Sequence, residues 1–191
     1  GDLAGMSANE LGAIAVKAAS EEAKLSETDV NEIIMGNCLP AGQGQAPARQ
    51  AAIKAGLDQG TEATTINKMC GSGLQAVINA IMQVGSGAND LVIAGGAESM
   101  SNAPFFSIEM RWGLKGDGLT LHDGLSRGRY TAGGKHHPVP GGMIETAENL
   151  RRDYAIGREE QDEFEEYMDA TATRTSTSSF LSEESLRNIE S

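Results

Sequence analysis

The chain has 191 residues, of which 39% are hydrophobic and 22% are charged, as in a soluble globular protein of one domain with an appendage. Its formal net charge of −12 argues against nucleic acid and acidic membrane surfaces as partners, because both would repel it. No run of about 18 apolar residues occurs, so we expect no membrane-spanning segment.

Helices and strands are predicted to alternate three times in the first half of the chain. Ser7 and Glu10 form a capping-box pattern, which predicts a helix that continues to about Leu25. The later elements are predicted as a strand at 30–37, a helix at 46–55, a strand at 63–68, a helix at 71–84 and a buried strand at 90–94. These strands are continuous apolar runs, which predicts an α/β fold with a mostly parallel sheet between helices.

The second half begins with an irregular stretch. Residues 101–142 are rich in Gly, Pro and polar residues, and we expect either a functional loop excursion or disorder. This stretch holds all three histidines and is the one locally basic region of an acidic chain. Two helices are predicted after it, at 143–154 and 158–168. The Ser/Thr-rich tail is expected to be poorly ordered. The predicted division is therefore an α/β domain at 1–110, a loop domain at 111–168 and a tail at 169–191.

The two cysteines, Cys38 and Cys70, are too few for a disulfide framework. They lack CxxC spacing and a nearby His, so we expect no metal site at the cysteines and a reducing, cytoplasmic location. Cys38 follows a predicted strand and is expected to be packed. Cys70 precedes Gly-Ser-Gly where a helix is predicted to begin, and helix N-termini stabilise thiolates. This pattern suggests covalent catalysis through an acyl-cysteine, but a packed cysteine and a phosphate-binding turn also remain open.

Several longer motifs resemble one enzyme family. INKMCGSGLQAV, LVIAGGAESMSNAPF, HDGL, TAEN and REEQDEF are similar to the N-terminal part of thiolases, over about residues 1–164. The resemblance implies acyl transfer between coenzyme A thioesters, with acetyl-CoA or another acyl-CoA as substrate and Cys70 as the catalytic nucleophile. It also implies that no metal or redox cofactor is needed, because neither hydride nor electron moves. The same resemblance implies a thiolase-like N-terminal domain with an inserted loop domain, and assembly into homo-oligomers.

The resemblance also implies substrate contacts in the loop domain. Leu125 and Met143 match positions that line the pantetheine channel. Apart from the resemblance, the charge of coenzyme A makes four cations of the loop candidates for binding its phosphates, with a solvated surface charge as the alternative for each: Arg111, Arg127, Arg129 and Lys135. Related thiolases often have a His directly before the Met, where this chain has Gly142. His137, or its neighbour His136, is a candidate replacement for that His.

Two further departures concern the extent of the chain. An apolar strand that thiolases have before the first helix is absent, as are the Gly-His-Pro, Asn-Glu-Ala-Phe and Cys-x-Gly motifs of the second half. We therefore expect this chain to be an incomplete fragment that cannot complete a Claisen condensation by itself. The alternatives are a non-catalytic truncated or degenerate thiolase copy that acts as an interaction partner, and a condensing enzyme of the ketoacyl-synthase type.

Overall fold

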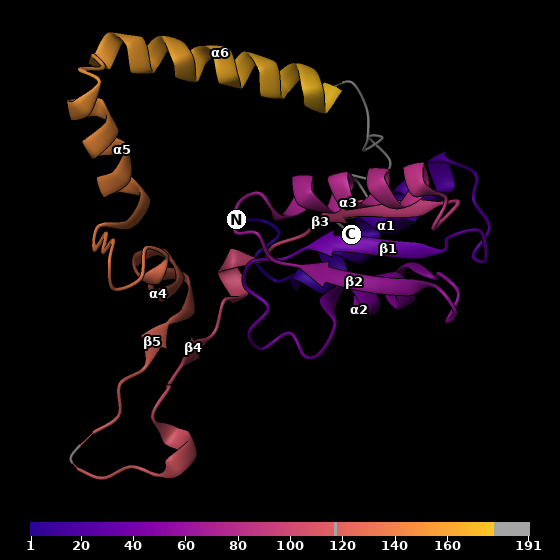
Figure 1. The fold of residues 1–191 in the computed structure, drawn as a ribbon, viewed down its shortest axis with the longest axis horizontal. Helices are drawn as coiled ribbons and strands as arrows, with labels where there is room; N and C mark the ends of the chain where they lie inside the picture. The colour runs from indigo at the N-terminus through magenta and orange to yellow at the C-terminus, as the bar shows by residue number, and fades with distance from the viewer. Residues whose placement is uncertain (117, 178–191) are drawn as a thin grey trace. The chain divides into compact units, whose positions relative to one another are not determined.

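The computed structural model describes residues 1–116 and 118–177 (Figure 1). Two compact units divide the chain, the first ending at Gly124 and the second beginning at Leu125, and each is described by itself. Within the described residues, no helix is long and apolar enough to cross a membrane.

The first unit is built on a three-stranded parallel sheet. Its main elements are α1 (Ala8–Glu22), β1 (Glu32–Gly36), α2 (Pro47–Ala55), β2 (Glu62–Ile66), α3 (Ser72–Ser86) and β3 (Val92–Gly96). The strand order is β2-β1-β3, so β1 lies in the centre. In register, Gly36 of β1 stands opposite Ile66 of β2 and Gly96 of β3, so all three strands end at one edge.

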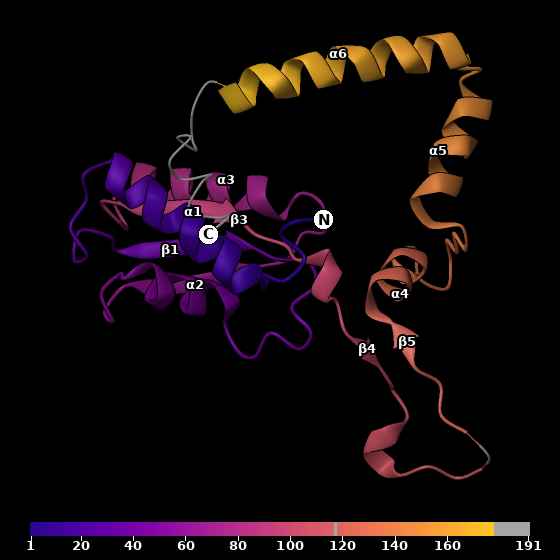
Figure 2. The same ribbon diagram turned by 180° about the vertical axis from the view of Figure 1, so that it is seen from behind.

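Helices cover both faces of this sheet (Figure 2). Alternate residues of β1 point to opposite sides, so Ile33 and Met35 pack in one cluster with Val16 of α1 and Ala52 of α2. Ile34 packs in the other cluster with Ala76 of α3. The predicted α/β architecture with a parallel sheet between helices is therefore confirmed.

The start of α1 is fixed by the predicted capping box. Ser7 Oγ accepts a hydrogen bond from the Glu10 N–H at 3.3 Å, and Glu10 Oε2 accepts one from the Ser7 N–H at 2.8 Å. The Ser7 backbone N–H lowers the pKa of Glu10 below its usual value. Because a lowered carboxyl pKa stabilises the ionised form, this contribution is present at neutral pH and is lost as the pH falls through the lowered pKa.

We expect Ser7→Ala to lower the free energy of unfolding by about 1 kcal/mol, because one N-terminal N–H of α1 loses its acceptor. Urea denaturation followed by circular dichroism measures this change. Ser20→Ala is the matched control: Ser20 Oγ donates to Val16 O inside the same helix, and Ala is the better helix former. Equal denaturation midpoints for Ser7→Ala and the control would contradict the cap's importance.

The structure corrects one expectation about the first unit and adds one feature that the sequence analysis did not predict. β3 is half-buried rather than buried, because it lies at an edge of the sheet and pairs only with β1 among the described strands. α3 buries Ala76 and Ala80 against the sheet but exposes a row of large apolar side chains, including Leu74 at 68% and Ile81 at 66% of full exposure. Isolated exposed apolar residues are ordinary, whereas a contiguous row is typical of an interaction surface.

The first unit ends in an excursion of short elements. These are η1 (Met100–Asn102), β4 (Phe105–Phe106), η2 (Met110–Trp112) and β5 (His122–Asp123), with β4 and β5 paired antiparallel. The stretch predicted to be irregular is thus mostly irregular in the structure. The same stretch of sequence also contains α4 (Gly124–Thr131), which begins at the boundary between the units and belongs from Leu125 onward to the second unit. The sequence did not indicate this helix, because its glycines and arginines hide any apolar periodicity.

The second unit holds the remaining helices, α5 (Gly142–Asp153) and α6 (Arg158–Thr177). Both were predicted, but α6 continues beyond residue 168 into the tail that was expected to be poorly ordered. A helix that has already formed extends one residue at a time at little cost, even through residues of modest propensity. Residues 178–191 of the predicted tail lie outside the described residues.

Candidate functional site

The candidate site lies where the three parallel strands end. The loop after β1 begins with Asn37 and Cys38, the loop after β2 runs from Asn67 to Cys70, and β3 is followed by Ala97 and Glu98. In open parallel sheets, ligands bind at the carboxyl ends of the strands. The register therefore brings the predicted nucleophile to the sheet edge where binding sites of α/β proteins occur.

Cys70 is exposed and lies directly before α3, whose N-cap is Gly71. The helix thus begins one residue later than predicted. Met69, the preceding residue, has φ 52°, a left-handed conformation that is strained for a side chain other than Gly. A cysteine held on a strained turn in front of a helix N-terminus is presented to solvent with its approach open.

The buried Ser72 side chain stabilises this turn through two hydrogen bonds to its backbone. Its buried Oγ accepts a hydrogen bond from the Lys68 N–H at 2.8 Å and donates one to Met69 O at 2.6 Å. Lys68 Nζ reaches along α3 to bond Gln75 Oε1. The Ser of Gly-Ser-Gly is therefore a structural clamp on the turn, a role that the sequence did not reveal.

Three glycines allow α3 to start against the sheet. A Cβ atom on Gly36 would lie 2.5 Å from the backbone carbon of Ser72 and 2.6 Å from the Gly73 nitrogen. A Cβ on Gly96 would lie 3.0 Å from Gly36 O and 3.5 Å from Gly73 Cα. The first turn of α3 thus rests on bare backbone at the ends of β1 and β3, which fixes where Cys70 stands.

Cys38 is the second thiol at this edge. Its S–H donates to Met69 O at 2.7 Å, and its sulfur lies 3.5 Å from Ser72 Oγ. Burial raises the pKa of the Cys38 thiol, and the nearby Glu98 carboxylate raises it further. The expected packed cysteine is thus half-buried and bonded to the nucleophile turn, a contact between distant segments with no signature in local sequence.

We expect iodoacetamide to alkylate Cys70 well before Cys38 at pH 7.5. Thiolate is the reacting species, and Cys38 is shielded and has a raised pKa, so its thiol keeps its proton to higher pH than an ordinary cysteine. Peptide mass mapping over time measures both rates. In urea, where burial is lost, Cys38 should react as an ordinary cysteine, and equal rates in the folded chain would contradict its shielding.

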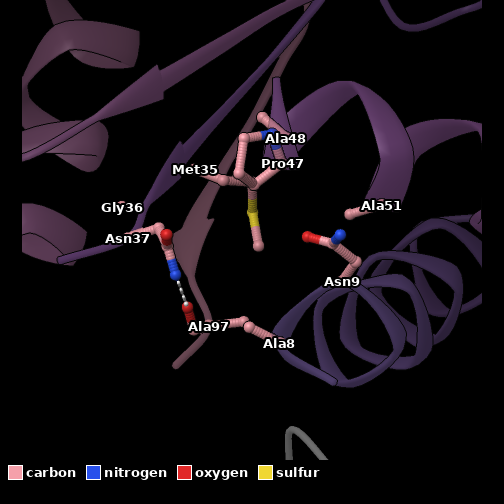
Figure 3. Close-up of a pocket in the computed structure, with 9 residues that line it drawn as sticks. All are labelled: Ala8, Asn9, Met35, Gly36, Asn37, Pro47, Ala48, Ala51 and Ala97. Carbon is pink, nitrogen blue, oxygen red and sulfur yellow. Dashed lines mark hydrogen bonds between the residues drawn. The ribbon is translucent and has the colours of Figure 1, made fainter. Parts of the chain in front are cut away.

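A small cavity of about 10 Å³ lies among residues of α1, β1 and α2 (Figure 3). Its lining residue Met35 packs on the face of the sheet opposite the one that α3 covers. Asn9, Met35 and Ala51 line the cavity, and the Asn37 side-chain amide at its edge donates to Ala97 O at 3.0 Å. This volume is close to the minimum for a single water molecule and far below that of a thioester substrate. The cavity is therefore a packing feature, and the candidate site is the exposed edge around Cys70.

The other predicted site residues belong to the second unit and are described there alone. Leu125 and Arg127 are half-buried on α4, and Arg127 Nη1 lies 3.4 Å from Tyr130 Oη. His137 is exposed, and its backbone N–H donates to Gly133 O at 3.2 Å. Met143 is exposed near the start of α5. Within residues 1–116 and 118–177, no group of three His, Cys, Asp or Glu side chains is placed to hold a metal ion.

Comparisons with known proteins agree on one family. The family model for the thiolase N-terminal domain matches residues 1–179. An acetyl-CoA acetyltransferase of Cupriavidus necator is 46% identical over 165 residues, which are 86% of this chain and 41% of that protein. A probable acetyl-CoA acyltransferase of Staphylococcus epidermidis is 43% identical over 82% of the chain and 39% of its own length. An acetyl-CoA acetyltransferase of Schizosaccharomyces pombe is 40% identical over 86% and 40%. The chain thus spans about two fifths of the length of these relatives.

Proposed function

The chain belongs to the thiolase family, and we propose that it carries the acyl-accepting step of an acyltransferase that acts on coenzyme A thioesters, with Cys70 as the nucleophile. The observation that carries this proposal is the exposed Cys70 on a strained, glycine-lined turn directly before α3. The names of the relatives, acetyl-CoA acetyltransferase and probable acetyl-CoA acyltransferase, support the same substrate class.

The proposed step is a thioester exchange. The Cys70 thiol loses its proton to water, and the thiolate sulfur forms a bond to the acyl carbonyl carbon. The bond from that carbon to the sulfur of coenzyme A then breaks, and coenzyme A leaves as a thiolate that takes up one proton from water. The Gly71 and Ser72 N–H groups already donate to Lys68 O and Met69 O at 3.1 Å, so the donors proposed for the oxyanion that develops on the carbonyl are the Cys70 N–H and the later N–H groups of the first turn of α3. The step needs neither a metal nor a redox cofactor, because no electron or hydride moves.

Substrate contacts in the second unit are part of the proposal. Leu125 and Met143 would contact the pantetheine arm, which is long and partly apolar. Arg127 and His137 would contact the phosphates or the thioester. A local cationic surface suits coenzyme A, which carries several negative charges, even though the chain as a whole is acidic.

Complete condensation requires other catalytic groups in addition to the nucleophile. A base must remove a proton from the methyl group of acetyl-CoA, and another group must assist the cysteine. We assign neither role to a residue of these 191, so we propose that the chain by itself accepts acyl groups slowly and does not form 3-ketoacyl-CoA. The apolar row on α3 supports a further proposal, homo-oligomeric assembly, and the two free thiols support a cytoplasmic location.

The test is the intact mass of the chain after incubation with acetyl-CoA. The expected result is one acetyl group per chain, found on the peptide that contains Cys70, with an equal amount of coenzyme A released. A folded chain that gains no acetyl group would overturn the proposal and would favour a non-catalytic thiolase copy. Formation of acetoacetyl-CoA by the chain alone would overturn the statement that it stops at the acyl-cysteine.

A further inference from the structure

The carboxylate of Glu98 accepts three hydrogen bonds from the loop after β1. Oε2 accepts from the Cys38 N–H at 2.6 Å, and Oε1 accepts from the Leu39 N–H at 3.1 Å. Oε1 also accepts from Asn37 Nδ2 at 2.9 Å. Glu98 itself is half-buried just beyond the end of β3. A carboxylate is the side chain that suits this position, because it offers acceptors on both oxygens and no donor.

The loop that Glu98 holds is in turn bonded to the nucleophile turn. Asn67 Nδ2 donates to Cys38 O at 3.2 Å, and the Cys38 S–H donates to Met69 O at 2.7 Å. Asn67 also reaches forward, since its Oδ1 accepts from the Met69 N–H at 2.9 Å. The two polar atoms of the Met69 backbone are therefore both engaged, one by Asn67 and the other by Cys38 and Ser72.

These bonds matter because Met69 is the strained residue. Its left-handed backbone, with φ 52°, persists only where the surroundings enforce it, and its side chain is 58% exposed and supplies little packing. Bonds to its N–H and C=O are thus the available means of holding it. If Met69 relaxed to an ordinary conformation, the direction of Cys70 relative to α3 would change.

We propose that Glu98 is a positioning residue for acyl transfer at Cys70, acting through the Cys38 loop on the backbone of Met69. The proposal rests on the proposed function for the identity of the reaction, but the contact from Glu98 to the turn is a property of the fold alone. Glu98 does not touch the substrate in this role, because its oxygens are taken by donors of the protein. Its effect falls on the rate of the step and not on the binding of the thioester.

Glu98→Gln is the primary test, because the amide keeps the size of the side chain but turns one acceptor into a donor. An amide N–H that faces the Cys38 or Leu39 N–H cannot accept its hydrogen bond, so at least one of these backbone bonds is lost. We expect the maximal rate of Cys70 acetylation to fall at least about tenfold, the loss typical of a slightly misplaced reacting group. The half-saturating acetyl-CoA concentration should stay the same. Glu98→Asp, which keeps two acceptor oxygens, should lose less than Glu98→Gln.

Amide hydrogen exchange tests the same proposal without any substrate. In Glu98→Gln we expect exchange in the peptide 67–72 to accelerate at least about tenfold while exchange in α1 stays unchanged, since the loosening is local. Glu22→Gln, at an exposed site on α1, is the matched control and should change neither the rate of Cys70 acetylation nor the exchange in 67–72. Unchanged exchange in 67–72, or an equal acceleration throughout the unit, would overturn the positioning role.

A second pair of variants tests the bond between Cys38 and Met69, for the case in which Glu98→Gln does not fold. Cys38→Ala removes the Cys38 donor to Met69 O and leaves the Ser72 donors, whereas Cys38→Ser keeps a side-chain donor at position 38. Both variants keep the backbone bond from residue 38 to Glu98. Faster exchange in 67–72 for Cys38→Ala than for Cys38→Ser supports the proposal that Glu98 acts on Met69 through Cys38, and equal exchange overturns it. If amide exchange in 67–72 is slow in the wild type but the wild type gains no acetyl group from acetyl-CoA, the proposed function fails, whereas the structural link from Glu98 to Met69 stands.

Discussion

Cys70→Ser should lower the rate of acetyl transfer from acetyl-CoA to the chain by at least about 10³-fold, the order of loss that follows removal of a catalytic nucleophile. Serine occupies nearly the same volume but ionises far less readily than cysteine, so the attacking species is missing. Because Cys70 is exposed and packs against little, the fold should not change. Intact mass over time, with equal acetyl-CoA concentrations, measures the two rates.

The control for this experiment lies on the same helix. Ser86→Ala changes the last residue of α3, at the opposite end from Cys70, and should acetylate like wild type. Circular dichroism should give the same melting midpoint for all three proteins. An acetyl group on Cys70→Ser at the wild-type rate would mean that another residue accepts it, and peptide mapping would identify that residue.

The local structure of the first unit was predictable because its signals are local. The Ser7–Glu10 pattern fixed the start of α1, and Pro47 and Gly56 stand at the first turn and just past the end of α2. The alternation of apolar runs with helical periods predicted the parallel sheet. Cys70 could be singled out for the same reason, since the residues that define its turn are its immediate neighbours.

The support behind Cys70 could not be predicted in the same way. Glu98 bonds Cys38 across 60 positions of sequence, and Cys38 bonds Met69 across 31. Such contacts arise only when parallel register brings strand ends together. The sequence alone also gave no reason for Met69 to adopt a left-handed conformation, because methionine disfavours it and only the surrounding bonds enforce it. The roles of Leu125, Arg127, His137 and Met143 stay predictions.

Gly36→Ala should destabilise the first unit by about 3 kcal/mol or more, at the upper end of the cost of overpacking. The new Cβ would lie 2.5 Å from the Ser72 carbon and 2.6 Å from the Gly73 nitrogen, and both are backbone atoms that cannot rotate away. Either α3 lifts from the sheet or the end of β1 bends. Both changes move the turn that carries Cys70, so acetylation should slow even in the fraction that remains folded.

Gly85→Ala separates this effect from the general consequences of replacing a glycine. Gly85 lies in the last turn of α3, and nothing stands within 4 Å of its Cβ position. Alanine there should be neutral or should stabilise the protein by about 0.5–1 kcal/mol, because Gly is the more flexible residue in the unfolded chain. Urea denaturation of both variants gives the comparison. If Gly36→Ala unfolded at the same urea concentration as Gly85→Ala, the first turn of α3 would not pack closely against β1. The position of Cys70 would then be determined by its turn alone.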